Sequence, residues 1–205
     1  EPFDTNNRDA INHLASIRHL ILDEHNYPAA DEVAQRMQGP YTQSYQPLGD
    51  LLIRSNHESQ ATDYLRTLDL DTAIATTRYR VGNTNFAREV FCSAPDDIVV
   101  AHFTCDTPGA LSLTISLESL HPSTSIASGP EHIGITGRCP QHVDPPYHGS
   151  DEPIIYDNNE HGKGMCFVGQ VQVLLEGGHL STLQDGSLSI QGATTVTILI
   201  AAATS

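Results

Sequence analysis

The 205-residue chain contains no tryptophan, and its aromatic residues make up only 6% of the sequence. The hydrophobic share is 39%, and a chain of this length can still bury one substantial core. We therefore expect a core of aliphatic side chains rather than aromatic anchors. We also expect the few Phe and Tyr residues mostly at strand-core positions.

Basic residues are also scarce, because 10 Lys and Arg face 25 Asp and Glu and give a formal net charge of −15. Such a field repels phosphate backbones and anionic lipid, so no nucleic acid and no membrane is expected as a partner. The longest apolar run, Val196 to Ala203, is far shorter than the roughly 20 residues that cross a bilayer. No signal peptide is recognisable, so the compartment stays open, including export as part of a longer enzyme.

Several motifs of enzymes and cofactor sites are missing. The four cysteines form no C-x-x-C pair, which argues against a cysteine-based zinc site, and free thiols are the simplest expectation. There is no G-x-S-x-G nucleophile elbow, and Gly162-Lys163-Gly164 lacks the spacing of a phosphate-binding loop. No cofactor is therefore expected.

The first forty residues have helical periodicity and predict a helical hairpin over residues 1–40. The apolar positions of the first helix are Ile11, Leu14, Ile17 and Ile21. The run Thr5-Asn6-Asn7 is of the type that caps a helix start. A second helix should begin at Pro28 and end before Gly39-Pro40.

From residue 44 onward the pattern changes to short β-rich runs separated by turn residues. The predicted strands are Leu51–Arg54, Tyr64–Leu70, Ala73–Val81, Phe86–Ser93, Ile98–Cys105, Leu111–Leu117, Cys166–Leu175, Leu180–Gln184, Leu188–Gln191 and Thr195–Ala202. A two-residue turn at Gly82-Asn83 sets Val81 opposite Thr84 and Tyr79 opposite Phe86. Strands without intervening helices predict a mainly β fold: an antiparallel two-sheet β-sandwich of the supersandwich type over 44–205, with a long loop at 140–164.

That loop is rich in residues that bind metals or transfer protons. A metal site would draw on His142, Asp144, His148, Asp151 and His161, but their separations do not place two imidazoles on one rigid face. Paired carboxylates for glycoside hydrolysis would come from Asp151, Glu152, Asp157 and Glu160, which lack a stable frame and a burial that would raise a pKa. Both alternatives are weaker than a polar inter-strand loop, so no metal is expected.

Particular strings resemble the N-terminal β-sandwich domain of glycoside hydrolase family 95, which comprises α-L-fucosidases with related L-galactosidase activity. They are "SYQPLGDLLI" (44–53), "YLRTLDLDTAIATTRYRVGNTNFAREVFCSAPDDIVV" (64–100), "HVDPPY" (142–147), "GKGMCF" (162–167) and "TILIAAATS" (197–205). The helical segment "IRHLILDEHNYPAADEVAQRMQGP" (17–40) resembles the helix pair ahead of the same domain. The resemblance implies an (α/α)6 catalytic barrel in the same polypeptide, which holds the acid and the water-activating groups of inverting hydrolysis.

The resemblance therefore implies that residues 1–205 form a single domain, an excerpt of a longer enzyme, with no catalytic residue of its own. We expect the chain to be inactive alone and to support the barrel, with fucosylated oligosaccharide reached only through the parent enzyme. The residues that would line the substrate pocket or the domain interface are Tyr45, Gln46, His142, Asp144 and Tyr147, whose polar groups suit sugar hydroxyls. The alternatives are a free-standing carbohydrate-binding or lectin-like sandwich and, weaker still, a metal-dependent enzyme.

Overall fold

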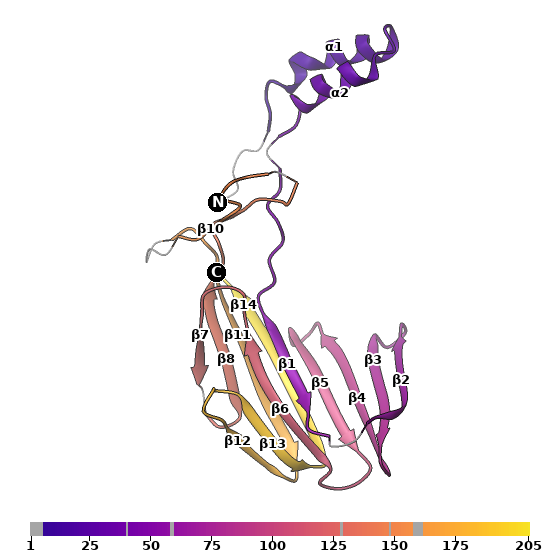
Figure 1. The fold of residues 1–205 in the computed structure, drawn as a ribbon, viewed down its shortest axis with the longest axis vertical. Coiled ribbons are helices and arrows are strands. Elements are labelled where there is room, and N and C mark those ends of the chain that lie inside the picture. The colour runs from indigo at the N-terminus through magenta and orange to yellow at the C-terminus, as the bar shows by residue number, and fades with distance from the viewer. Residues whose placement is uncertain (1–5, 40, 58–59, 128, 148, 158–161) are drawn as a thin grey trace. The chain divides into compact units, whose positions relative to one another are not determined.

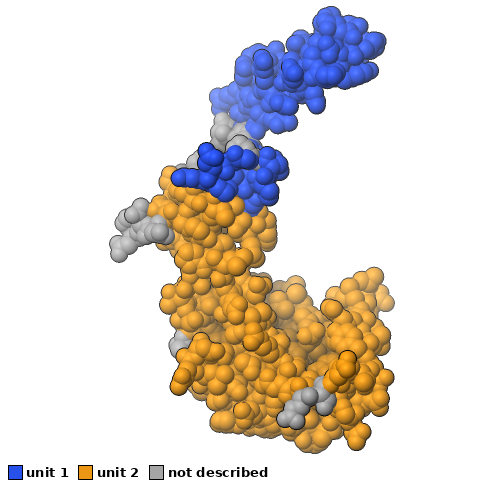
Figure 2. Space-filling model, viewed as in Figure 1, with its two compact units in different colours: residues 1–44, 144–153 blue, residues 45–143, 154–205 orange. Residues whose placement is uncertain are grey.

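A computed structural model of the chain describes residues 6–39, 41–57, 60–127, 129–147, 149–157 and 162–205. Its internal contacts divide the chain into two compact units (Figure 2). Unit 1 comprises residues 1–44 and 144–153, and unit 2 comprises residues 45–143 and 154–205. The helices belong to unit 1 and the strands to unit 2, so each unit has its own type of secondary structure.

The helical hairpin of unit 1 confirms the periodicity of the first forty residues. Helix α1 spans Ala10–Leu22 and helix α2 spans Tyr27–Gln35. The Asn26 side chain caps α2 by accepting a hydrogen bond from the Ala29 amide at 3.2 Å. Pro28 lies in the first turn, where its missing N–H costs nothing.

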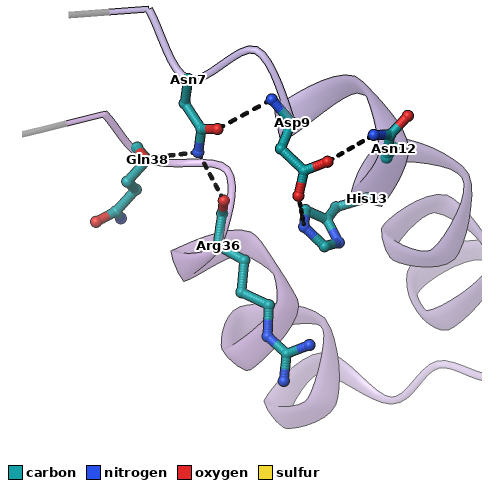
Figure 3. A network of polar contacts seen from close by, with 6 residues as sticks. All are labelled: Asn7, Asp9, Asn12, His13, Arg36 and Gln38. Atoms are coloured by element: carbon teal, nitrogen blue, oxygen red, sulfur yellow. Dashed lines mark hydrogen bonds and ion pairs between the residues drawn. The ribbon is translucent and has the colours of Figure 1, made fainter.

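The capping-type run ahead of α1 does not supply the N-cap residue of the helix. Its N-cap is Asp9, whose side chain makes no capping hydrogen bond, and Thr5 lies outside the described residues. Asn7 accepts a hydrogen bond at Oδ1 from the Asp9 amide at 3.1 Å, and it donates from Nδ2 to the carbonyls of Arg36 and Gln38, at 2.8 and 2.9 Å, just beyond the end of α2 (Figure 3). The Asn7 side chain therefore links the start of α1 to carbonyls that follow α2.

Unit 2 is an antiparallel β-sandwich, as the sequence predicts (Figure 1). The larger sheet has eight strands in the order β2-β3-β4-β5-β14-β11-β8-β7, and the smaller has four in the order β1-β6-β13-β12. The bounds of the larger sheet are β2 Thr62–Asp69, β3 Ile74–Val81, β4 Thr84–Ser93, β5 Ile98–Cys105, β14 Thr195–Thr204, β11 Cys166–Glu176, β8 His132–Arg138 and β7 Ser123–Ala127. Those of the smaller sheet are β1 Asp50–Ser55, β6 Leu111–Glu118, β13 Leu188–Ala193 and β12 His179–Thr182.

The core lies between the two sheets and is mainly aliphatic, as expected. Its fully buried side chains include Leu113 and Ile115 of β6, Ile190 of β13, Val171 of β11 and Ile198 of β14. These residues alternate with more exposed ones along β6 and β11, which is the period-two pattern of a strand with one buried face. Phe86 and Phe103 are the two aromatic side chains among the buried members of this core cluster.

The β3–β4 hairpin confirms the predicted register. Val81 pairs with Thr84 and Tyr79 with Phe86 across the Gly82-Asn83 turn. Gly82 has a φ of 59°, a left-handed conformation that glycine adopts without steric cost.

Four strands between residues 118 and 165 were not predicted from the sequence. Strands β7 and β8 are rich in serine, threonine and glycine, and the short pair β9 (His142–Val143) and β10 (Ile154–Ile155) interrupts the predicted loop. The hydrophobic alternation that marks strands is weak there because Gly134 and Gly137 occupy positions against β11. A Cβ on Gly137 would lie 2.5 Å from the Phe167 ring, so close packing excludes the side chains that would have revealed the strand.

All four cysteines are free thiols, as the sequence indicates. Burial, and then the neighbouring Cys166 thiol, raises the pKa of Cys139. In the described part of the chain, neither helix is long and apolar enough to cross a membrane.

Candidate functional site

The five residues singled out in the sequence are divided between the two units. Asp144 and Tyr147 belong to unit 1, whereas Tyr45, Gln46 and His142 belong to unit 2. Each unit therefore presents its own polar group, and these are described in turn.

In unit 1, Asp144 ties the segment after the helical hairpin to the 144–153 segment. The Tyr41 hydroxyl donates to Oδ1 of Asp144 at 2.9 Å, and the Ser44 hydroxyl donates to the Asp144 carbonyl at 3.2 Å. The Asp144 amide donates to the Pro153 carbonyl at 2.8 Å. Only 8% of Asp144 is exposed, so its carboxyl group is held in place by neighbours rather than displayed to solvent.

Tyr41 is the titratable partner in this group. Loss of solvent around its ring, and then the hydrogen bond and charge of Asp144, raise the pKa of the Tyr41 phenol above its ordinary value. The hydroxyl therefore keeps its proton at neutral pH and remains a donor to the carboxylate. The pair orients the local backbone, and nothing in it generates a nucleophile or a free base.

Two tyrosines present large, exposed surfaces. Tyr147 in unit 1 is 78% exposed and Tyr45 in unit 2 is 97% exposed. Next to Tyr45, the Gln46 side chain donates to the Tyr45 carbonyl at 3.1 Å. Such rings are suited to cover an apolar surface while the phenol makes a hydrogen bond, as at interfaces.

His142 is the remaining candidate. It lies in β9, opposite Ile155 of β10, and is half-buried. The neighbouring Gln141 amide donates to the Ile155 carbonyl at 2.9 Å. His142 is therefore positioned by a short ladder, not by a free loop.

The expected placement of tyrosines inside strands is wrong. Five of the seven tyrosines are exposed: Tyr27, Tyr41, Tyr45, Tyr64 and Tyr147. Four of these lie in helix or irregular segments, where alternation does not decide the burial of a side chain.

The metal and acid alternatives gain no support from the described residues. Among these, no three His, Cys, Asp or Glu side chains are arranged to hold a metal ion. Two of the suggested ligands, His148 and His161, lie outside the described residues, as does Glu160. Asp151 and Glu152 are exposed to solvent and lie in no helix or strand.

The sequence did not single out His121, which is the polar centre of one end of unit 2. It is 5% exposed, with Nε2 3.0 Å from the Pro47 carbonyl and Nδ1 3.0 Å from the Tyr156 hydroxyl. Because a carbonyl only accepts, Nε2 donates to Pro47, and in the neutral ring Nδ1 accepts from Tyr156. Nothing in the string around His121 distinguishes it from the other ten histidines, so only the fold could have identified it.

Close packing accounts for two glycines in the strings that carried the family resemblance. A Cβ on Gly49, in "QPLGDLLI", would lie 2.5 Å from the Glu118 carbonyl oxygen. Likewise, a Cβ on Gly164, in "GKGMCF", would collide with the Cys139 carbonyl oxygen. Both strings therefore mark places where one backbone approaches another, which is a requirement of the fold rather than of catalysis.

Comparison with known proteins finds similarity to two proteins named as fucosidases. Alpha-L-fucosidase 2 of Arabidopsis thaliana is 33% identical over 211 residues, covering 98% of this chain and 24% of that protein. Probable alpha-fucosidase A of Aspergillus niger is 32% identical over 101 residues, covering 48% of this chain and 13% of that protein. The chain thus spans about a quarter or less of each relative.

A protein-family profile shows to which family the chain belongs. The profile described as "Glycosyl hydrolase family 65, N-terminal domain" matches residues 1–205, the entire chain. The resemblance to glycoside hydrolases is confirmed at this level, while the narrower placement in family 95 stays a prediction. The chain belongs to the family of glycosyl hydrolase family 65 N-terminal domains.

Proposed function

We propose that this chain is the non-catalytic N-terminal β-sandwich of a family 95 glycoside hydrolase that removes terminal α-L-fucosyl residues. Its role is to support an (α/α)6 catalytic barrel of the same polypeptide. The observation that carries the proposal is the match to an Arabidopsis protein named alpha-L-fucosidase 2, which extends over 98% of this chain. A match of that extent covers the helical hairpin as well as the sandwich.

The polar groups of the chain support a structural role. Asp144 is engaged by Tyr41, and His121 is engaged by Pro47 and Tyr156, so neither is a free acid or base. Inverting hydrolysis requires two carboxyl groups held about 6.5–9.5 Å apart on a firm frame. The exposed acids Asp151 and Glu152 are not placed on such a frame, because they lie in no strand or helix.

The exposed tyrosines are the side chains best suited to contact the barrel or the substrate pocket. Tyr45 and Tyr147 combine a large apolar ring with a hydroxyl, and both are displayed to solvent in the isolated chain. We assign Tyr45, Gln46, His142 and Tyr147 to such contacts, and Asp144 to holding the segment that carries Tyr147.

The proposal is tested by comparing the 205-residue chain with the full-length gene product on an α-1,2-fucosylated oligosaccharide. We expect fucose release by the full-length protein and none by the isolated chain. Release by the isolated chain that disappeared in Asp151→Asn would contradict the non-catalytic assignment. A full-length protein inactive on fucosides but active on another glycoside would contradict the substrate.

The supporting role has its own test in the full-length protein. Tyr45→Ala should lower the thermal midpoint of the catalytic domain or raise KM, whereas Tyr27→Ala, an exposed tyrosine on α2, serves as the control. An unchanged midpoint and unchanged kinetics in Tyr45→Ala and Tyr147→Ala would remove these residues from the interface.

A free-standing carbohydrate-binding module is the second candidate, and the exposed tyrosines are the observation in its favour. Titration of the isolated chain with the same oligosaccharide separates the two. Saturable binding that is lost in Tyr45→Ala or Tyr147→Ala, with no dependence on a barrel, would support the binding module instead.

A further inference from the structure

A polar hollow lies over strands β2 to β5 of the larger sheet. Figure 1 shows these four strands side by side at one end of that sheet. The hollow has a volume of about 440 Å³, which is within the range of pockets that hold small molecules. The polar residues and the alanine that line it are Asp63, Arg78, Asn85, Ala87, Thr104 and Asp106.

The strand register places part of this lining on the face of the sheet that points away from the core. Arg78 of β3 pairs with Ala87 of β4, and Ala87 pairs with Thr104 of β5. The neighbouring residue on β4, Phe86, is 5% exposed and belongs to the core. Because side chains alternate between the two faces of a strand, the row through Ala87 lies on the outer face. Ala87 has the smallest side chain of its row, so the surface is depressed between a guanidinium and a hydroxyl.

Asp106 is a fixed carboxylate at one end of the hollow. Asn85 donates from Nδ2 to Oδ2 of Asp106 at 2.7 Å and from its amide to Oδ1 at 3.0 Å. The Asp106 amide donates in return to the Asn85 carbonyl at 3.1 Å. The hydrogen bonds from Asn85 hold the pKa of the Asp106 carboxyl group below its ordinary value, so the group is charged at neutral pH. Since a carboxylate has about four acceptor positions, Asp106 can also accept from a ligand.

A β-bulge in β2 supplies a second carboxylate. Thr62 pairs with Arg80 and Leu65 pairs with Arg78, so β2 has one more residue than β3 between these two pairs. Within the bulge Asp63 has a φ of 52°, a left-handed conformation that aspartate adopts more readily than most residues. Its carboxylate lies 2.6 Å from Nη2 of Arg80 and lines the hollow. A bulge is a usual means of redirecting one side chain of a strand.

Arg78 provides the hydrogen-bond donors. Within the described part of the chain it forms no ion pair, whereas Arg80, two residues further along β3, is paired with Asp63. A guanidinium has five N–H donors in a fixed plane. The donors of Arg78 are therefore available to oxygen atoms of a ligand in the hollow.

The charges around the hollow favour a neutral ligand. The two arginines, Arg78 and Arg80, balance the two carboxylates, Asp63 and Asp106, so the site offers no net charge to an ion. A hydroxyl group can donate to a carboxylate and accept from a guanidinium, and two adjacent hydroxyls can do both at once. Ala87 in the hollow offers an apolar contact for the C–H groups that lie beside such hydroxyls.

We propose that this hollow binds a neutral pyranose through two adjacent hydroxyl groups. One hydroxyl donates to the Asp106 carboxylate, the other accepts from the Arg78 guanidinium, and the sugar ring lies over Ala87 with the Thr104 hydroxyl beside it. None of these residues is among those assigned above to contacts with the barrel or the substrate pocket. The sugar site is therefore independent of the proposed hydrolase function.

The probe is methyl β-D-galactopyranoside, a neutral sugar with a free 3,4-diol, titrated into the ¹⁵N-labelled chain and followed by NMR. We expect saturable shifts of the Ala87 and Thr104 amides and of the Arg78 Nε–H at millimolar sugar. The 3,4-O-isopropylidene derivative of the same glycoside, in which the diol is blocked, should cause none of these shifts. Calorimetric titration of the full-length gene product with both sugars should give the same difference.

Two substitutions locate the binding. Arg78→Gln should weaken the affinity for the galactoside about tenfold, which corresponds to about 1.4 kcal/mol. Ala87→Leu should abolish binding by filling the hollow. Arg66→Gln is the matched control, because Arg66 is also an exposed arginine at this end of the sheet but does not line the hollow. If Arg78→Gln does not fold, the comparison of the free and blocked diols on the unaltered chain provides the test.

Three results would overturn the proposal. The first is an absence of shifts at Ala87 and Thr104 in millimolar galactoside. The second is equal affinity of Arg78→Gln and Arg66→Gln for the galactoside. The third is tighter binding of methyl β-D-glucopyranosiduronate than of the galactoside, which would make the hollow an anion site. Sugar-induced shifts confined to Tyr45 or Tyr147 would likewise exclude this hollow, and they would leave the proposed hydrolase function untouched.

Discussion

At the scale of single residues, the most restrictive positions are those where backbones meet. Gly49 and His121 both hold the segment ahead of β1, the first by lacking a side chain and the second by donating to the Pro47 carbonyl. The Ser119 hydroxyl donates to the Leu48 carbonyl at 2.7 Å in the same place. The segment is therefore held at three consecutive residues: the carbonyls of Pro47 and Leu48 accept hydrogen bonds, and Gly49 packs against the Glu118 backbone.

Gly49→Ala should lower the free energy of unfolding by about 1–3 kcal/mol or more, because its Cβ would lie 2.5 Å from the Glu118 carbonyl oxygen. Urea unfolding followed by circular dichroism measures this change without tryptophan. Gly169→Ala is the control, since its Cβ would meet Leu48 at an ordinary 3.4 Å. Equal stability of the two variants would contradict the close approach at Gly49.

His121→Phe should cost about 1–3 kcal/mol, because it keeps a ring but leaves the Pro47 carbonyl and the Tyr156 hydroxyl without their partner. Tyr156→Phe made in the His121→Phe background should then cost less than it does in the unaltered chain. Additive costs in this double-mutant cycle would show that the two side chains are not coupled.

At the scale of elements, the helical hairpin depends on polar contacts more than on burial. Helix α1 has no buried residue, and α2 has one, Ala30. In Figure 3, Asn7 joins the start of α1 to the carbonyls that follow α2, and Asp9 contacts Asn12 and His13 within α1. Such a hairpin should respond to pH more than the sandwich does.

His19 near the end of α1 gives that response a direction. The hydrogen bond with Asp23 at 2.7 Å, and then the charges of Glu24 and Asp23, raise the pKa of His19 above 6.5. Because the pKa is raised in the folded state, protonated His19 stabilises the folded hairpin. This stabilisation is fully present below pH 6.5 and is lost as the pH rises through the higher folded-state pKa.

We therefore expect an NMR titration of His19 with a midpoint above 6.5, and faster amide exchange at the end of α1, after correction for intrinsic rates, once the pH passes that midpoint. Asp23→Asn should move the midpoint back toward 6.5. A midpoint that does not change in Asp23→Asn would assign the shift to another group.

At the scale of the whole molecule, the decisive feature of unit 2 is the unequal width of its sheets. The central strands of the larger sheet are buried against the four-stranded sheet, whereas the edge strand β2 is exposed along its length, so equivalent strand positions differ in what they contribute to stability. Ile198 on β14 is fully buried, whereas Leu68 on β2 is 62% exposed.

Ile198→Ala should therefore destabilise the chain by about 2–5 kcal/mol, since it removes buried apolar volume and leaves a cavity. Leu68→Ala should change the stability of the isolated chain by less than about 0.5 kcal/mol, as exposed substitutions usually do. Denaturant midpoints measure both, and a large loss in Leu68→Ala would mean that β2–β4 is covered in solution.

The sequence by itself determined the class of fold and most of its elements, since strand alternation and helical spacing are local properties that reflect which face is buried. The β3–β4 register followed from the Gly82-Asn83 turn for the same local reason. Only the tertiary structure decided the strands β7 and β8, because Gly134 and Gly137 are small where another strand approaches and leave no hydrophobic pattern. It also decided the roles of His121 and Asn7, because each contacts residues that are distant in the sequence, and spacing along the chain does not contain that information.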